Sequence, residues 1–326
     1  MPLWWSTVRE VFISDDRSVS PVVATILMVA VVVVIAASIG AVAFGFTGDL
    51  GGTSIAANEG QCLQSVNFDP NDIDSFADSA AADLDCVLWF DATQESFSDG
   101  QEVDQWTDRS GNGFDATSST EPGVSNPEYV EDLDGVSAVR FEDGGGIEGL
   151  DTDATANEIG IDGRQSFTTS VVIRPNQDSD GAILQAGTID GTAWGYQPDL
   201  ASDQWLFQIS GDGEFYFISY DDADDDEDWV VVSTVYDGNS ISIYKNGRSL
   251  VEADVFEGGD VDESDINVTD TPFNIGFFNW DGPDNGLDGA IAEVVVLDDT
   301  SRDIDREVLE CTFDEKHGSN VNVEGC

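Results

Sequence analysis

The sequence predicts a mainly β protein, an antiparallel β-sandwich that is preceded by one long hydrophobic α-helix and followed by a short C-terminal helix. Three observations support this prediction. No residue between Val19 and Phe46 carries a charge. From Cys86 onward, short apolar runs alternate with Gly, Asp and Asn turns about every ten residues, as in antiparallel sandwiches. Residues Ser301 to Lys316 repeat apolar side chains at helical spacing.

The uncharged stretch 19–46 is long enough to cross a membrane as a helix, because about 20 apolar residues span the hydrocarbon core. Pro21 suits the first turn, where a missing N–H leaves no helical hydrogen bond unmade. Contacts with lipid or with neighbouring helices are expected from apolar positions along this segment, including Ile26, Leu27, Val31 and Ile35.

Residues 1–18 end in SDDRS, so the small residue Ser18 precedes the apolar block, whereas a secretory signal places its cleavage site after that block. With SVSPVVATILMVAVVVVIAA, this arrangement resembles the class III signal of archaeal type IV pilins, especially haloarchaeal ones. The resemblance implies that a prepilin peptidase cuts between Ser18 and Val19. The retained helix would then leave the membrane to pack against other pilin subunits. Val23 stands where bacterial pilins commonly have Glu, and a simple signal anchor stays open as the alternative.

The chain has 66 acidic and 11 basic side chains, and a formal net charge of −55. Concentrated salt removes most of the resulting repulsion, because the Debye length falls to about 3 Å at 1 M. We therefore predict a halophilic protein. Such an acidic surface argues against nucleic acid as a partner. The 40% hydrophobic residues predict a folded core rather than disorder.

The cysteine pattern predicts two disulfides in an exported protein. No CxxC pair occurs and His317 is the single histidine, so a zinc site is not expected. Three pairings are possible, and the sequence alone does not choose among them. Local loops would join Cys62 to Cys86 and Cys311 to Cys326, whereas a nested pairing would join Cys86 to Cys311 and Cys62 to Cys326.

Four segments are expected along the chain: a leader at 1–18, the helix at 19–46, a linker or stalk at 47–85, and the sandwich at 86–326. The linker is rich in Gly, Ala, Ser and Asp, and few of its residues could fill a core. In the final helix, Ser301 is a candidate N-cap for an inner face of Ile304, Val308, Leu309 and Phe313. The ten expected strands are 87–91, 138–141, 167–173, 181–185, 204–209, 215–220, 229–236, 240–245, 273–278 and 290–297.

These residues also carry a resemblance to laminin G-like, concanavalin A-like jelly rolls. The matching motifs are CVLWFDAT from Cys86, VDQWTDRSGNGFDAT from Val103, AVRF from Ala138, SFTTSVVIRP from Ser166, WVVVSTVYDGNSISIYKNG from Trp229 and LDGAIAEVVVLDDTSRDIDREVLE from Leu287. The resemblance implies the fold. It does not imply one chemistry, because this fold hosts sugar-binding modules, protein-binding modules and glycoside hydrolases.

The sequence predicts no catalytic residues. Hydrolases of this fold carry Glu-x-Asp-x-x-Glu on one strand, and no such run occurs. The nearest candidates, Glu293 and Asp298, face opposite ways because of their odd spacing. We therefore interpret Glu293 as a paired structural carboxylate.

A binding module needs an aromatic platform beside convergent polar groups, sometimes with a calcium ion held by loop oxygens. The loop 279–288 offers Trp280, Asp281 and Asn285 for a ligand, and Asp281, Asp284 and Asp288 for calcium as a possible cofactor. Further candidates are the cluster 108–112 and the aromatic residues Trp194 and Tyr196. Ordinary acidic turns would give the same pattern, so that interpretation stays open. Asn267 lies in the single N-glycosylation sequon.

Together these patterns predict a pilin-like subunit at the cell surface, whose jelly roll mediates adhesion by binding glycans or surface proteins. Two alternatives remain: a purely structural filament coat, and a membrane-anchored glycan-processing enzyme.

Overall fold

The computed structural model describes residues 86–142, 146–155, 158–159, 166–176, 181–186, 199–200, 204–211, 214–221, 228–254, 272–279, 283–284, 286–298 and 303–326. The chain divides into two compact units, Met1–Ala56 and Ala57–Cys326. The predicted cleavage site, apolar helix and linker, with Cys62, lie outside the described residues. Among the residues that are described, no helix is long and apolar enough to span a membrane.

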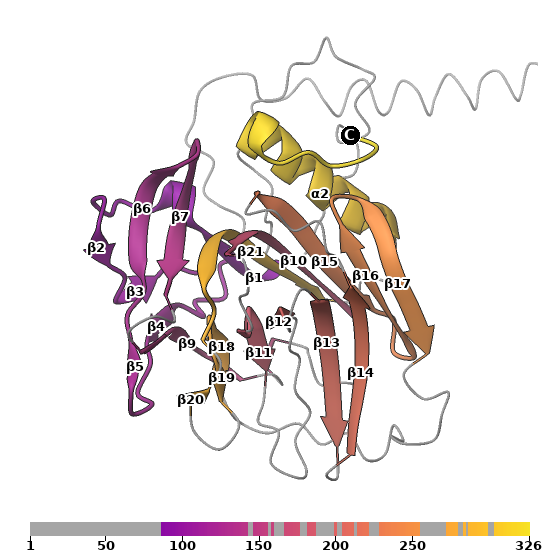
Figure 1. Cartoon of the computed structure of the whole chain (residues 1–326), viewed down its shortest axis with the longest axis horizontal. Helices are drawn as coiled ribbons and strands as arrows, with labels where there is room; N and C mark the ends of the chain where they lie inside the picture. Colours follow the sequence, from indigo (N-terminus) through magenta and orange to yellow (C-terminus); the bar gives the residue numbers. More distant parts are fainter. Residues whose placement is uncertain are drawn as a thin grey trace, which may run out of the picture. The chain divides into compact units, whose positions relative to one another are not determined.

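The largest sheet has nine strands and is built around β21 (Gly289–Asp298). On one side β21 pairs with β10 (Phe167–Pro175), and on the other with both β1 (Cys86–Asp91) and β7 (Val136–Phe141), in each case antiparallel. The other strands are β2 (Gln101–Glu102), β6 (Glu128–Leu133), β15 (Val230–Tyr236), β16 (Ser240–Lys245) and β17 (Arg248–Asp254). The order is β17-β16-β15-β10-β21-β7-β6-β2, with β1 beside β21 (Figure 1).

A second sheet has five strands in the order β11-β18-β9-β4-β3. Its strands are β3 (Gln105–Trp106), β4 (Ala116–Ser118), β9 (Leu150–Thr155), β11 (Leu184–Ala186) and β18 (Pro272–Ile275). The smaller sheets contain β12 (Asp199–Leu200), β13 (Gln204–Gly211) and β14 (Glu214–Asp221); β19 (Phe278–Asn279) and β20 (Pro283–Asp284); and the parallel pair β5 (Val124–Ser125) and β8 (Ile147–Glu148). Two 3-10 turns, η3 (Ala92–Gln94) and η4 (Gly318–Asn320), complete the described elements.

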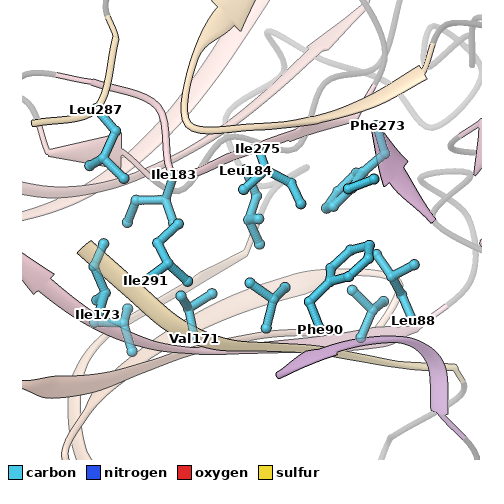
Figure 2. Close-up of a cluster of buried hydrophobic side chains, with 14 of the residues drawn as sticks. Leu88, Phe90, Val171, Ile173, Ile183, Leu184, Phe273, Ile275, Leu287 and Ile291 are labelled. Carbon is cyan, nitrogen blue, oxygen red and sulfur yellow. The ribbon is translucent and has the colours of Figure 1, made fainter. Parts of the chain in front are cut away.

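The main core lies between the nine-stranded sheet and the five-stranded sheet. The β12–β13–β14 sheet also contributes to it, through Trp205, Phe207 and Ile218. Side chains at alternate positions of a strand point to the same face, so Val171 and Ile173 of β10 both turn inward. They meet Phe273 and Ile275 of β18, which approach from the opposite layer (Figure 2). The predicted antiparallel β-sandwich is therefore confirmed.

The other face of the nine-stranded sheet is covered by the helix α2 (Asp303–His317), drawn in yellow in Figure 1. Val308, Leu309 and Phe313 of α2 are buried against the outward side chains of the sheet, including Val172 and Val295. The predicted helix and these three inner positions are confirmed. Ser301 and the side chain of Ile304 lie outside the described residues.

All ten predicted strand regions contain strands, but the prediction missed several others. The longest of these are β6 (EYVEDL), β9 (LDTDAT) and β17 (RSLVEAD). They were missed because acidic and small polar residues occupy the alternate positions and leave few apolar residues to mark the strand.

Cys311 and Cys326 form a disulfide that ties the C-terminal tail to α2. This bond belongs to the local pairing and rules out the nested one. Cys86 is also disulfide-bonded, and its partner lies outside the described residues.

Candidate functional site

The loop 279–288, which the sequence predicts as a site for a ligand or calcium, includes most of the hairpin β19–β20, whose two strands pair antiparallel. The chain is anchored beyond the hairpin. Leu287 is fully buried, and its amide donates to the Gly276 carbonyl at 2.7 Å. The hairpin is therefore held against the second sheet through its buried end. Outside the described residues lie Trp280, Asp281, Asn285 and the side chain of Asp284.

Asp288 is the one predicted calcium ligand whose side chain the structure describes, and it anchors the loop. Its half-exposed carboxylate accepts a hydrogen bond from the side-chain amide of Asn176. The backbone N–H of Asn176 donates to the backbone carbonyl of Asp288 at 3.0 Å. No three His, Cys, Asp or Glu side chains among the described residues form a metal-binding group. The other predicted sites, Trp194, Tyr196 and Asn267, lie outside the described residues.

The cluster 108–112 is a turn whose polar groups bond to one another. The Asp108 carboxylate accepts hydrogen bonds from the amides of Trp89, Ser110 and Phe114 at 2.9–3.1 Å, and from the Ser110 hydroxyl at 2.8 Å. Asn112 donates to the Val87 carbonyl at 2.9 Å. Because these groups already have protein partners, the cluster holds the loop against β1 rather than presenting free ligands.

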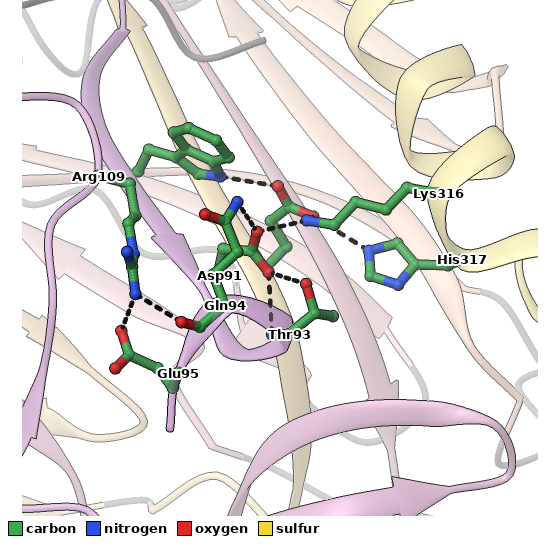
Figure 3. Close-up of polar contacts among 9 residues, drawn as sticks. Asp91, Thr93, Gln94, Glu95, Arg109, Lys316 and His317 are labelled. Carbon is green, nitrogen blue, oxygen red and sulfur yellow. Dashed lines mark hydrogen bonds and ion pairs between the residues drawn. The ribbon is translucent and has the colours of Figure 1, made fainter. Parts of the chain in front are cut away.

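An extensive polar cluster in the described part of the chain joins β1, β21 and the last turn of α2 (Figure 3). Lys316 Nζ lies 2.7 Å from Asp91 Oδ2 and 2.6 Å from Glu293 Oε2. Glu293 also accepts from Trp89 Nε1 at 2.7 Å and lies 3.0 Å from His317 Nε2. The prediction that Glu293 is a paired structural carboxylate is confirmed.

An irregularity in the sheet turns Glu293 toward α2. The register between β10 and β21 shifts between Val172 and Ile173, which pair with Glu293 and Ile291. Ala292, between them, is thus the extra residue of a bulge, which re-aims the side chains that follow. Strict alternation would have placed Glu293 in the apolar core between the sheets.

The burial of the cluster decides what it can do. Asp91 is 0% exposed and the Glu293 side chain 2%, and Lys316 lies against both carboxylates. A glycosidase pair must reach its sugar and a water molecule. These two carboxylates instead face a cation within the fold, so the cluster fastens α2 to the sheet.

Burial by itself would raise the pKa of Asp91. It is outweighed by the charge and hydrogen bond of Lys316, assisted by hydrogen bonds from Thr93 and Gln94, and the pKa is lowered from 3.8. The ionised carboxylate is thus the form that the fold favours.

A second buried ion pair lies nearer the start of α2. Arg306 is bonded to Glu310 one turn later, and its guanidinium stacks over the Tyr244 ring at 3.8 Å. Burial raises the pKa of Glu310, against the opposing charge of Arg306. Charged groups of α2 therefore contact both β16 and the centre of the nine-stranded sheet.

Two family models match different parts of the chain. Residues 17–56 match the archaeal type IV pilin N-terminal family, and residues 148–302 match the concanavalin A-like lectin/glucanases superfamily. The chain joins a pilin-type N-terminus to a concanavalin A-like domain. No curated protein matches the sequence.

Solved structures similar to the concanavalin A-like domain are distant in sequence. One described as a receptor binding domain is 15% identical with a TM-score of 0.50, and the match covers 70% of this chain and 50% of that one. The binding domain of botulinum neurotoxin DC, in complex with rat synaptotagmin II, is 14% identical with a TM-score of 0.49 and coverages of 70% and 51%. The match thus spans about half the length of these chains, and at this identity it shows the fold alone.

Sequence reasoning did not find the partners of Glu293. Asp91 is separated from it by about 200 residues and Lys316 lies on a different element. The sequence carried no signal for these partners, because the pairing of β1 with β21, which puts Asp91 opposite Glu293, is a tertiary arrangement. Two carboxylates in that position require a cation nearby, and Lys316 is one of only 11 basic residues.

Proposed function

We propose that this chain is a subunit of an archaeal surface filament and that it displays its concanavalin A-like domain to bind a surface component, in particular a glycan. The observation that carries the proposal is the joining of the two matched segments, a pilin-type N-terminus at 17–56 and the concanavalin A-like match at 148–302. In this proposal, a prepilin peptidase cuts between Ser18 and Val19, and the apolar helix packs against those of other subunits.

Display on a filament suits weak binding. Many copies held on one fibre convert later binding events into intramolecular ones, and this raises avidity by orders of magnitude without tight individual contacts. The net charge of −55 also matters, because concentrated salt screens charges beyond about 3 Å at 1 M. Recognition must then depend on short-range contacts such as aromatic stacking and direct hydrogen bonds.

Within this proposal, the loop 279–288 is the first ligand region to test. Trp280 supplies a stacking surface, Asp281 and Asn285 supply polar contacts, and Asp281, Asp284 and Asp288 supply carboxylates for calcium. Trp194 and Tyr196 form a second candidate surface, and Asn267 is a glycosylation position. The anchored end at Leu287 supports the loop as a binding element, because an end that is already held in place loses less entropy when a ligand binds.

An enzymatic role has less support. The superfamily description includes glucanases, but the adjacent carboxylates Asp91 and Glu293 are buried against Lys316. A hydrolysis screen with the full-length protein tests this alternative, and release of sugar from any tested glycan would favour it.

The test of binding uses intact filaments sheared from cells, incubated at molar salt with glycan arrays and with cell-surface extract. We expect retention of at least one glycan or surface component, and weaker retention by filaments carrying Trp280→Ala. Filaments carrying Trp194→Ala are the matched comparison, because that substitution removes an aromatic residue from the other candidate surface. Filaments that retain nothing would favour the structural coat instead.

A further inference from the structure

A concave surface that shares no residue with the loop 279–288 lies between the β16–β17 hairpin and the C-terminal tail. It is a cavity of about 540 Å³ lined by Lys245, Asn246, Arg248 and the tail residues 322–325. This volume lies within the range of small-ligand pockets, about 300–1,000 Å³. Most of the lining side chains are polar, which favours a hydrophilic ligand.

Charges of both signs line this pocket. Arg248 and Glu324 are exposed, and neither forms an ion pair within the described part of the chain, so a cation and an anion share the cavity without contact. Lys245 is already engaged, because its Nζ lies over the Trp205 ring, 5.9 Å from the ring centre. A bound anion would be repelled by Glu324 and a bound cation by Arg248. The pocket therefore favours an uncharged ligand.

The exposed polar groups of the pocket supply both hydrogen-bond donors and acceptors. The Arg248 guanidinium only donates, the Glu324 carboxylate only accepts, and the Asn322 amide does both. A hydroxyl group also donates and accepts, so a ligand that carries several hydroxyls can satisfy all three side chains. Hydrogen bonds at contact distance remain in molar salt, whereas attraction over longer distances is screened.

The walls of the pocket are fixed before any ligand arrives. The hairpin turns at Asn246 and Gly247, both with positive φ, and the Asn246 side chain accepts a hydrogen bond from the Val231 amide at 2.8 Å. The tail pairs with this turn through the Glu324 amide, 2.8 Å from the Asn246 carbonyl. A Cβ at position 247 would lie 2.5 Å from the Glu324 carbonyl oxygen, so the close approach requires glycine.

The tail is held from its other side as well. The Val323 amide donates to Asp314 Oδ1 at 3.0 Å, Val323 is buried, and the Cys311–Cys326 disulfide ties the chain end to α2. A pocket whose walls are already ordered loses little conformational entropy on binding.

We propose that this pocket binds an uncharged sugar ring of a saccharide, which rests on the proposed function by naming its ligand class. The ring carries hydroxyls on neighbouring carbons. Arg248 and Asn322 meet these hydroxyls as donors, and Glu324 meets them as an acceptor. Because the ring has no charge, neither Arg248 nor Glu324 repels it. The pocket is thus a ligand position of its own, formed by residues other than those of the loop 279–288.

The experiment uses full-length protein in filaments at molar salt and saturation-transfer NMR. All filaments carry Trp280→Ala, so that the signal reports this pocket rather than the loop 279–288. The probes are glucose, galactose and mannose, and the uronic acid and amino sugar of each hexose are the charged comparisons. We expect transfer to at least one neutral hexose, and weaker transfer to both of its charged forms.

Two substitutions test the roles of the charged side chains. Arg248→Gln should weaken binding of the neutral hexose about tenfold or more, because a charged hydrogen-bond partner is lost. Glu324→Gln keeps the size of the side chain but removes its charge, so the uronic acid should bind more nearly as well as the hexose. A merely structural role for Glu324 would leave that difference unchanged. Arg140→Gln is the matched control, since it removes a charge from a surface ion pair, and it should leave binding unchanged.

Three results would overturn the inference: no transfer to any of the three hexoses, equal binding of the hexose with and without Arg248→Gln, or tighter binding of a charged form than of its neutral hexose. Filaments with intact Trp280 are tested in parallel with surface extract. Retention of extract without hexose transfer would refute this pocket alone, whereas loss of both would refute the proposed function too.

Discussion

The two faces of the nine-stranded sheet are covered in different ways. On the inner face, Phe90, Val171 and Ile291 pack against the apolar side chains of the second sheet (Figure 2). On the outer face, α2 combines apolar contacts with two buried ionic groups, one around Lys316 and one around Arg306. The helix could bury a similar apolar area in several positions on the sheet, whereas a buried ion pair forms only where its charged groups meet. We infer that the inner face supplies most of the stability and that the ionic groups fix where the helix docks.

The largest expected effect is on the inner face. Phe90 is fully buried with its ring 5.4 Å from that of Trp106, so Phe90→Ala leaves a cavity and should lower the free energy of unfolding by roughly 3–5 kcal/mol. Urea unfolding at molar salt measures the loss. Phe97→Ala is the control, because Phe97 is only partly buried against Tyr129. Equal losses for the two variants would show that full burial of Phe90 between the sheets adds nothing beyond the partial burial of Phe97.

Removing the cation of the outer face should have a smaller effect. Lys316→Met leaves Asp91 and Glu293 side by side without a positive charge, and the free energy of unfolding should fall by about 3 kcal/mol. This is the low end for a buried pair, because the Lys316 side chain is 23% exposed. Arg140→Met breaks an ion pair at the surface and should cost less than about 1 kcal/mol. The same urea measurement compares them, and a Lys316→Met loss no larger than the control would refute the fastening role.

The pH dependence should distinguish the two ionic groups, with effects on the order of 1 kcal/mol. The pKa of Asp91 is lowered in the fold, so its stabilisation is present above 3.8 and is lost as the pH falls through the folded value. The pKa of Glu310 is raised, so its contribution is present below 4.5 and is lost as the pH rises through the folded value.

Unfolding curves from pH 3 to 7 for Asp91→Asn and Glu310→Gln test these opposite signs. The stability gap between the unaltered protein and Asp91→Asn should close below pH 3.8. The unaltered protein should gain stability relative to Glu310→Gln as the pH falls toward 4.5. Parallel curves for all three proteins would show that neither carboxyl is shifted by folding.

The fold was predictable because the central strands are recognisable in the sequence as apolar runs. The runs at 167–173 and 290–297 are nearly all apolar or small, as strands covered on both faces must be, and they became the centre of the large sheet. Strand β9, LDTDAT, was not predictable in this way because only Leu150 and Ala154 mark its inner face. The helix α2 was predictable from the spacing of Val308, Leu309 and Phe313.

The polar sites depended on information that residue type does not carry. Asp108 looked like a ligand candidate because Asp, Ser, Gly and Asn serve both turns and binding loops, and only its hydrogen bonds identify the turn. The concave surface lined by Asn246, Arg248 and residues 322–325 was not predicted, because it forms where the β16–β17 hairpin meets a C-terminal tail about 75 residues later in the chain. Such a meeting depends on tertiary packing and on the Cys311–Cys326 bond.

The most direct test of the proposed filament subunit is the N-terminal sequence and intact mass of the protein in sheared surface filaments. A mature chain that begins at Val19 and is recovered in filaments is the predicted result, because the apolar segment is then retained for assembly. An uncut chain, or one cut after the apolar segment, would contradict the account. The concanavalin A-like domain would then belong to an anchored or secreted protein rather than to a filament.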